Sequence, residues 1–231
     1  MKRPSRVPIA FLPTAIEKLP RLSEHLGGPE VWVKRDDQTG LAFGGNKTRK
    51  LEYLLGAAQK VGAQMLLTAG APQSNHCRQT AAAAAGMGMA CTLVLAGEEP
   101  EQPSANILLD RILGAEIVWA AKGERDDILQ AEFERAEQAG KQPYLVPYGG
   151  SSPTGAAAYA FAIEELAGQG LAPDWIVLAT SSGGTQAGML AGRMLFESGG
   201  QILGISVDEP AGVLKERIAD LAGNCVAILG E

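Results

Sequence analysis

The chain has 231 residues, of which 46% are hydrophobic, and its 20 basic and 26 acidic side chains give a net charge of −6. This length and apolar content are sufficient for a sizeable buried core. The excess of acidic side chains argues against a nucleic-acid partner, and no run reaches the roughly 18 apolar residues of a membrane span.

Short apolar runs alternate with helix-like stretches along the whole chain. We expect strands near residues 65–68, 91–95, 116–119, 144–146, 175–179 and 202–207. We expect helices near residues 47–60, 75–87, 104–113, 126–139, 155–167 and 185–197. Connections of this length imply parallel strands with helices on both faces, and a ligand should then bind at the carboxyl ends of the strands.

The most informative short motif surrounds Lys47, in the run Gly44-Gly45-Asn46-Lys47. We interpret Asn46 as the N-cap of a helix that has Lys47 in its first turn. The partial positive charge of a helix N-terminus, together with partial burial, would lower the pKa of this lysine. It would then be a nucleophile able to form a Schiff base. The alternative is an ordinary solvated lysine at a helix start.

Two loops follow apolar runs and lead into helices. One is Thr68–His76, and the other is Thr180–Thr185. The second loop combines small side chains, two hydroxyls and a helix N-terminus, which favours phosphate binding. It lacks the Gly-Lys-Ser/Thr ending of a P-loop, and the chain has no dinucleotide-binding G-x-G-x-x-G motif. A plain strand-to-helix turn is the alternative interpretation.

The cysteines and histidines predict neither disulfides nor a metal site. Cys77, Cys91 and Cys225 form no C-x-x-C motif, which favours free buried thiols in a reducing cytoplasm. The two histidines, His25 and His76, are too few and too far apart to indicate a metal centre.

Further motifs extend along nearly the whole chain in a consistent order and spacing. They are Leu12-Pro13-Thr14, Val33-Lys34-Arg35-Asp36-Asp37, Gly44-Gly45-Asn46-Lys47, Gln73-Ser74-Asn75-His76, Asn106-Ile107-Leu108-Leu109-Asp110, Pro147-Tyr148-Gly149-Gly150-Ser151, Ser182-Gly183-Gly184-Thr185 and Val207-Asp208-Glu209. Together they resemble the D-cysteine desulfhydrase and 1-aminocyclopropane-1-carboxylate deaminase family of pyridoxal-phosphate enzymes.

The resemblance implies an α/β fold of two lobes, built as three-layer αβα units with mostly parallel sheets. This is the pyridoxal-phosphate fold type II, similar to the β subunit of tryptophan synthase. It also implies a large domain of residues 1–46 plus 154–231 and a small domain of residues 47–153. The cofactor, pyridoxal 5′-phosphate, would lie in the cleft between them.

The resemblance also implies roles for individual residues. Lys47 would hold the cofactor covalently and later move protons, and Ser74 would lie beside the substrate. Asn75 would hydrogen-bond the phenolic oxygen of the cofactor ring, and Lys50 would lend its charge to the phosphate. The phosphate cup would consist of Ser182, Gly183, Gly184 and Thr185. For Ser74 and Asn75, helix capping is the alternative role.

The implied function is that of a lyase acting on a small amino acid, with D-cysteine converted to pyruvate, sulfide and ammonia. Deamination of 1-aminocyclopropane-1-carboxylate and desulfonation of cysteate are the alternatives, and a homodimer is the implied assembly. Chains of the family continue beyond the point that corresponds to Glu231. We therefore expect a truncated chain with an incomplete large domain, and an inactive remnant that binds the cofactor without turnover is a further alternative. The last alternative is a phosphate-binding module without a Schiff base, in which Lys47 is incidental.

Overall fold

The computed structural model describes residues 1–121, 123–197 and 200–230. Glu231, the last residue of the predicted large domain, lies outside the described residues, as do Lys122 in the predicted small domain and residues 198–199 in the predicted large domain. Within the described ranges, no helix is both long enough and apolar enough to cross a membrane.

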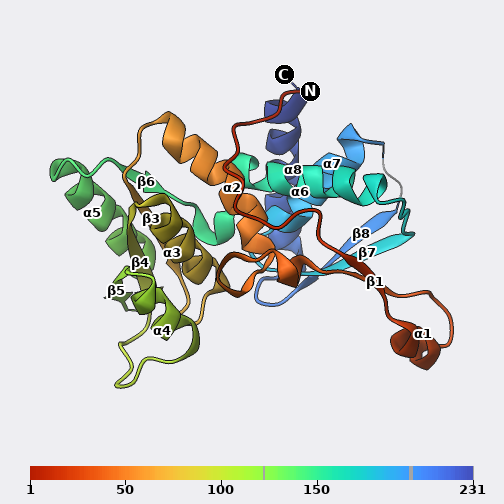
Figure 1. Ribbon diagram of the computed structural model, residues 1–231, viewed down its shortest axis with the longest axis horizontal. Helices are drawn as coiled ribbons and strands as arrows, with labels where there is room; N and C mark the ends of the chain where they lie inside the picture. Colours follow the sequence, from red (N-terminus) through yellow and green to blue (C-terminus); the bar gives the residue numbers. More distant parts are fainter. Residues whose placement is uncertain (122, 198–199, 231) are drawn as a thin grey trace.

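The elements alternate along the chain in the order that Figure 1 shows. The strands are β1 (Ile16–Lys18), β2 (Trp32–Lys34), β3 (Met65–Gly70), β4 (Ala90–Ala96), β5 (Glu116–Ala120), β6 (Pro143–Leu145), β7 (Trp175–Thr180) and β8 (Gln201–Ser206). The α-helices are α1 (Pro20–Leu26), α2 (Asn46–Lys60), α3 (Asn75–Met87), α4 (Ala105–Ile112), α5 (Arg125–Gln138), α6 (Pro153–Gly168), α7 (Gly184–Leu195) and α8 (Ala211–Gly230).

A four-stranded parallel sheet with the order β5-β4-β3-β6 forms the centre of one unit. Successive side chains of a strand point to opposite faces, and both faces of this sheet are apolar. Leu66 packs with side chains of α2, α3 and α4, whereas its neighbour Leu67 packs with Phe133 and Ala136 of α5. The sheet therefore lies between two helical layers, as the three-layer prediction requires.

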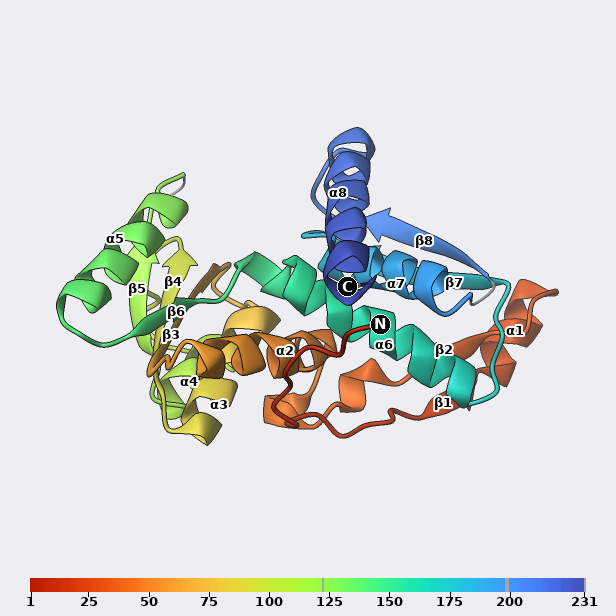
Figure 2. The same ribbon diagram turned by 90° about the horizontal axis from the view of Figure 1, so that it is seen from above.

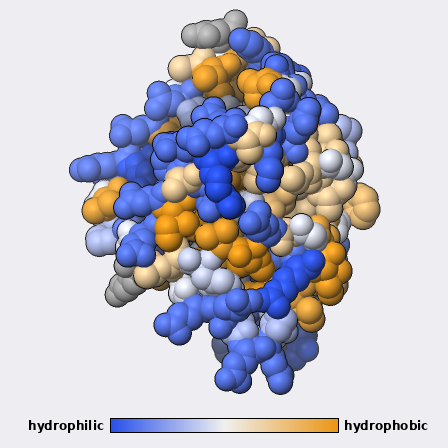
Figure 3. Space-filling view, turned by 90° about the vertical axis from the view of Figure 1, so that its left-hand side faces the viewer, coloured by the Kyte–Doolittle hydropathy of each residue, from blue (hydrophilic) through white to orange (hydrophobic). Residues whose placement is uncertain are grey.

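The outer helix α5 covers one face of this sheet with an apolar stripe and presents charged side chains to solvent. Leu129, Phe133 and Ala136 face the sheet at the spacing of successive helical turns. Seen from the side of the molecule on which α5 lies, hydrophilic side chains project around smaller hydrophobic patches (Figure 3).

The second unit contains the parallel pair β7–β8 and the helices α6, α7 and α8. Figures 1 and 2 show this unit at the opposite end of the molecule from the four-stranded sheet. Its helix α6 packs against α2 where the two units meet. Helix α2 contributes to both cores, because Leu51 and Leu54 join the cluster around the sheet while Tyr53 joins the cluster of α6 and α8.

The predicted strands and helices are all present, with boundaries that differ by at most two residues. The C-terminal helix α8, the antiparallel pair β1–β2 and the helix α1 between the strands of that pair were not predicted. Each strand has three residues, which is too short to produce a clear alternation of apolar and polar side chains. The boundaries of the predicted domains stay a prediction.

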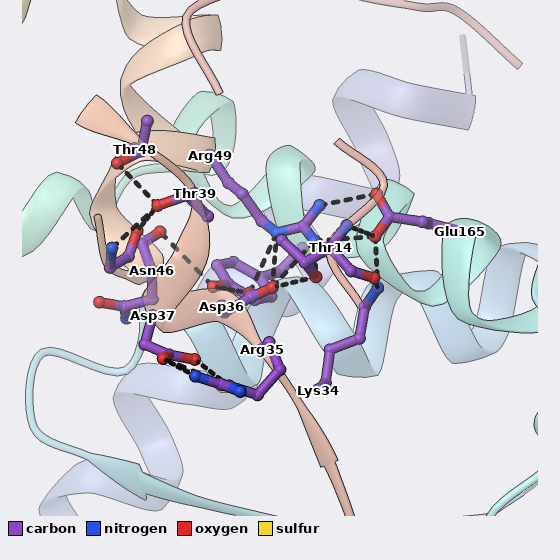
Figure 4. Close-up of polar contacts among 12 residues, drawn as sticks. Thr14, Lys34, Arg35, Asp36, Asp37, Thr39, Asn46, Thr48, Arg49 and Glu165 are labelled. Carbon is purple, nitrogen blue, oxygen red and sulfur yellow. Dashed lines mark hydrogen bonds and ion pairs between the residues drawn. The ribbon is translucent and has the colours of Figure 1, made fainter. Parts of the chain in front are cut away.

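A buried guanidinium ties the N-terminal segment, α2 and α6 together (Figure 4). Arg49 on α2 is only 2% exposed and donates hydrogen bonds to both carboxylate oxygens of Asp36 and to both of Glu165, at 2.9–3.1 Å. It also donates to the hydroxyl of Thr14 at 3.0 Å. Burial raises the pKa of Glu165, but hydrogen bonds from Arg49 and Lys34 outweigh it and lower the pKa to about 2.

We predict that Arg49→Met lowers the free energy of unfolding by about 3–5 kcal/mol, because it leaves the largely buried carboxylate of Asp36 without its cation and Glu165 with Lys34 alone. Urea denaturation at neutral pH measures this loss. The matched control is Arg35→Met, since Arg35 pairs with Glu17 and Asp37 at exposed positions and its loss should cost far less. Equal losses in the two variants would contradict the prediction.

Candidate active site

A cavity of about 380 Å³ opens at the carboxyl ends of β3 and β7. The N-termini of three helices, α2, α3 and α7, meet around it. Its lining residues are Asn46, Lys47, Ser74, Asn75, His76, Tyr148, Gly149, Ala179, Thr180, Ser181, Ser182, Gly183, Gly184, Thr185 and Val207. Of the eight site residues predicted from the sequence, this cavity brings together all except Lys50.

Lys47 lies in the first turn of α2, as predicted, and burial lowers the pKa of its amine. The prediction that Asn46 caps this helix is wrong. Gly45 is the N-cap, with a φ of 127° that favours glycine, and Asn46 is the first helical residue. The Asn46 side chain instead donates a hydrogen bond to the hydroxyl of Thr185 at 3.0 Å, which joins α2 to the first turn of α7.

Lys50 lies one turn further along α2, directly behind the lined cavity. It is 1% exposed, and its ammonium donates to the carbonyl of Gly149 at 3.2 Å. Burial lowers the pKa of Lys50 well below its ordinary value, and the charge of Lys47 adds to this effect. A Cβ atom added at Gly184 would lie 2.9 Å from the Lys50 Nζ, so this cation lies against the backbone of the predicted phosphate loop.

The loop of residues 182–185 turns directly into α7. Gly183 is the N-cap with a φ of 84°, and Gly184 begins the helix. The Gly184 N–H donates to the hydroxyl of Ser151, which itself donates to the hydroxyl of Ser182 at 2.8 Å. In the described part of the chain, the N–H groups of Gly183 and Thr185 have no hydrogen-bond partner. The loop therefore offers backbone donors at a helix N-terminus, which suits an anion.

Ser74 and Asn75 lie at the start of α3. Ser74 is the N-cap, and its hydroxyl oxygen accepts a hydrogen bond from the Cys77 N–H at 3.2 Å. The capping alternative is therefore correct for Ser74, yet the same hydroxyl lines the cavity and retains its proton for donation. Asn75 is exposed at the cavity, as the first residue of the helix.

His76 was not predicted as a site residue, although it lines the cavity and is only 3% exposed. The hydroxyl of Thr68 donates its single proton to the carbonyl of Val146 at 2.8 Å. It must therefore accept from the His76 Nε2, which lies 2.9 Å away. The proton of the neutral ring is then on Nε2, and the buried Nδ1 is an acceptor with no partner in the described residues.

The sequence did not predict a role for two other residues of the site, although it singled out the motif that contains them. Tyr148 lines the cavity and lies beneath the guanidinium of Arg125, 4.6 Å from the ring centroid. Ser151 links the loop of residues 182–185 to the start of α6. Both belong to the run from Pro147 to Ser151, so the signal was present but did not assign a role to each residue.

The cysteines take no part in this site. All three are free and buried, as predicted, and burial raises the pKa of Cys77 to about 12. A thiol with so high a pKa is a poor nucleophile at neutral pH. Within the described residues, no group of three or more potential metal ligands is present.

Comparison with known proteins agrees with this geometry. Residues 7–221 match the family model described as pyridoxal-phosphate dependent enzyme. A putative 1-aminocyclopropane-1-carboxylate deaminase from Pyrococcus abyssi is 41% identical over 236 residues, covering 98% of this chain and 71% of the relative. A D-cysteine desulfhydrase from Salmonella choleraesuis is 40% identical over 229 residues, covering 94% and 68%. A solved structure of a homologue of 1-aminocyclopropane-1-carboxylate deaminase superposes with a TM-score of 0.93 at 37% identity, covering 99% of this chain and 70% of that one.

We predict that the His76 ring is still neutral, with its proton on Nε2, at pH 6, below the ordinary histidine pKa of about 6.5. Burial lowers the pKa of His76 well below that value, and the charges of Lys47 and Lys50 lower it further. Nitrogen-15 NMR of the imidazole rings measures this directly, because the exposed His25 is the one other histidine. Lys47→Ala should raise the pKa of His76, and a doubly protonated ring at pH 6 in the wild type would contradict the assignment.

Proposed function

Because the chain belongs to the pyridoxal-phosphate dependent enzymes, we propose that it is a lyase for a small amino acid and that Lys47 binds the cofactor covalently. One observation carries this proposal. Lys47, whose pKa is lowered by burial, lines the same cavity as the donor-rich loop of residues 182–185. An amine with a lowered pKa is a nucleophile, and the loop that lines the same cavity suits a phosphate.

The residues of the cavity fit the phosphate of this cofactor. The N–H groups of Gly183 and Thr185, which are unpaired among the described residues, and the hydroxyl of Ser182 would donate to its oxygens. Lys50 would supply the positive charge, because its buried ammonium lies against Gly184 and has only a carbonyl as partner among the described residues. A buried cation without an anion is costly, and a bound phosphate would supply that anion.

The remaining lining residues fit the ring and the substrate. Asn75 would hydrogen-bond the phenolic oxygen of the ring, while Ser74 would donate its free proton to the carboxylate of an amino acid. Lys47 would remove the proton from the α-carbon once the substrate amine has replaced it. When bound, pyridoxal phosphate withdraws electrons from that carbon and makes the proton removable.

For the substrate we propose D-cysteine, with water, to give pyruvate, sulfide and ammonia. The relatives with about 40% identity include proteins named D-cysteine desulfhydrase and proteins named 1-aminocyclopropane-1-carboxylate deaminase. The motif Ser74-Asn75-His76 and the run from Asn106 to Asp110 favour the desulfhydrase, so deamination of 1-aminocyclopropane-1-carboxylate is the second candidate. The homodimer and the cytoplasmic location stay predictions.

We predict that pyridoxal phosphate added to the purified chain gives a visible absorbance band, and that borohydride then fixes the cofactor on Lys47, as peptide mass spectrometry would show. Lys47→Ala should abolish both signals. Lys60→Ala is the matched control, because Lys60 is an exposed lysine at the end of the same helix. An unchanged band in Lys47→Ala would contradict the proposed role.

We predict that D-cysteine releases sulfide and ammonia in equal amounts, and that Ser74→Ala lowers kcat/KM by roughly 10- to 100-fold. The reason is that a hydrogen bond to a charged group contributes about 1.5–3 kcal/mol. Ammonia from 1-aminocyclopropane-1-carboxylate, without sulfide from D-cysteine, would favour the second candidate. A cofactor band without turnover of either compound would favour a binding protein over a lyase.

A further inference from the structure

Arg78 is a buried cation of α3 that joins three segments around the cavity. It is 8% exposed. Its Nη1 donates to the side-chain carbonyl of Asn75 at 2.9 Å and to that of Asn106 at 2.7 Å. Its Nη2 donates to the backbone carbonyl of Gly44 at 3.1 Å, in the loop that precedes Lys47 and its helix. One guanidinium therefore sets the position of both the α2 start and the α3 start.

Asn106, at the start of α4, adds a second donor to Asn75. Its Nδ2 donates to the backbone carbonyl of Gln73 at 2.7 Å and to the Oδ1 of Asn75 at 3.1 Å. Its Oδ1 accepts from Arg78, so the Asn106 side chain is held at both ends, and its backbone N–H donates to the Gln73 side chain at 2.8 Å. Both lone pairs of the Asn75 Oδ1 are thus occupied by donors.

These contacts determine which way the Asn75 amide faces. A guanidinium has donors and no acceptor, so the atom of Asn75 that faces Arg78 must be the oxygen. The reversed amide would put an NH₂ group 2.9 Å from another donor and leave both without an acceptor, which is costly next to a buried charge. The Nδ2 of Asn75 consequently remains for the cavity, where Asn75 is exposed.

We propose that Arg78 and Asn106 are positioning residues that lock the Asn75 amide with its NH₂ group toward the cavity, so that this position accepts only a hydrogen-bond acceptor. The inference rests on the proposed function, in which that acceptor is the phenolic oxygen of the cofactor ring. The positive charge of Arg78 behind the amide strengthens the preference for an anionic oxygen. The lock therefore selects the ionised form of the ring hydroxyl.

The test is binding of pyridoxine 5′-phosphate, which keeps the ring oxygen and the phosphate but has no aldehyde for Lys47. Calorimetric titration would give its Kd for the wild type, Asn75→Ala, Arg78→Met and the double variant. We expect each single variant to weaken binding about tenfold, the equivalent of one lost hydrogen bond. The double variant should also be about tenfold weaker, because both substitutions remove the same contact.

Further variants separate positioning from folding. Asn106→Ala keeps the guanidinium in place and should weaken binding about threefold, again without adding to Asn75→Ala. Arg78→Lys keeps one donor for Asn75 and should recover most of the affinity lost in Arg78→Met. Asn75→Asp offers an acceptor in place of the donor and should bind more weakly than Asn75→Ala. Arg111→Met, which removes an exposed arginine of α4, is the control and should bind as the wild type does.

The outcomes are distinguishable. A hundredfold loss in the double variant would show that Arg78 acts independently of Asn75 and would overturn the lock. Wild-type affinity in both Arg78→Met and Asn106→Ala would overturn it as well, while leaving the cofactor assignment intact. A wild-type chain that binds neither pyridoxine 5′-phosphate nor pyridoxal phosphate would overturn the proposed function and this inference together.

Discussion

The buried ion pairs of Arg49 are the constraint on which the rest of the site depends. One guanidinium pairs with two carboxylates, Asp36 before α2 and Glu165 on α6, and so restrains the rotation of α2 about its own axis. Lys47 and Lys50 are on the same helix within one turn of Arg49, so their directions are fixed with it. Because α2 also supplies apolar side chains to the cores of both units, it holds the two units together beside the cavity.

Arg49 and Lys50 are both buried basic residues of α2, but their partners suggest a structural role for Arg49 and a functional role for Lys50. Both are almost completely buried, yet Arg49 has a carboxylate on each side, whereas Lys50 has a single carbonyl within the described residues. Burial accordingly lowers the pKa of Lys50, while the carboxylates keep the pKa of Arg49 raised. A fold retains an uncompensated buried charge at a cost in stability, and such costs are typical of binding sites. The cavity is thus electrostatically prepared for an anion before any ligand arrives.

The sequence was sufficient to predict the parallel sheet and the position of the site, because both depend on local signals. Strong apolar runs such as Met65–Gly70 and the glycine-rich turns before α2 and α7 define the elements and the edge where they end. The sequence was not sufficient to predict the polar contacts between these elements. Asn46 has good capping chemistry, but the helix begins one residue earlier, after Gly45, whose φ of 127° favours glycine. The partnership of Arg78 with Asn106 joins residues that are 28 positions apart, and no local pattern reveals it.

The polarity of the whole cavity follows from these contacts. Donors and positive charge approach it from α2, α3 and α7, and even the Asn75 amide faces it with its NH₂ group. His76 differs from these donors. Burial lowers the pKa of its ring, and the charges of Lys47 and Lys50 lower it further, so the neutral ring keeps a lone pair on Nδ1. The same two cations that suit a phosphate therefore help burial to preserve one acceptor in the cavity that Lys47 also lines.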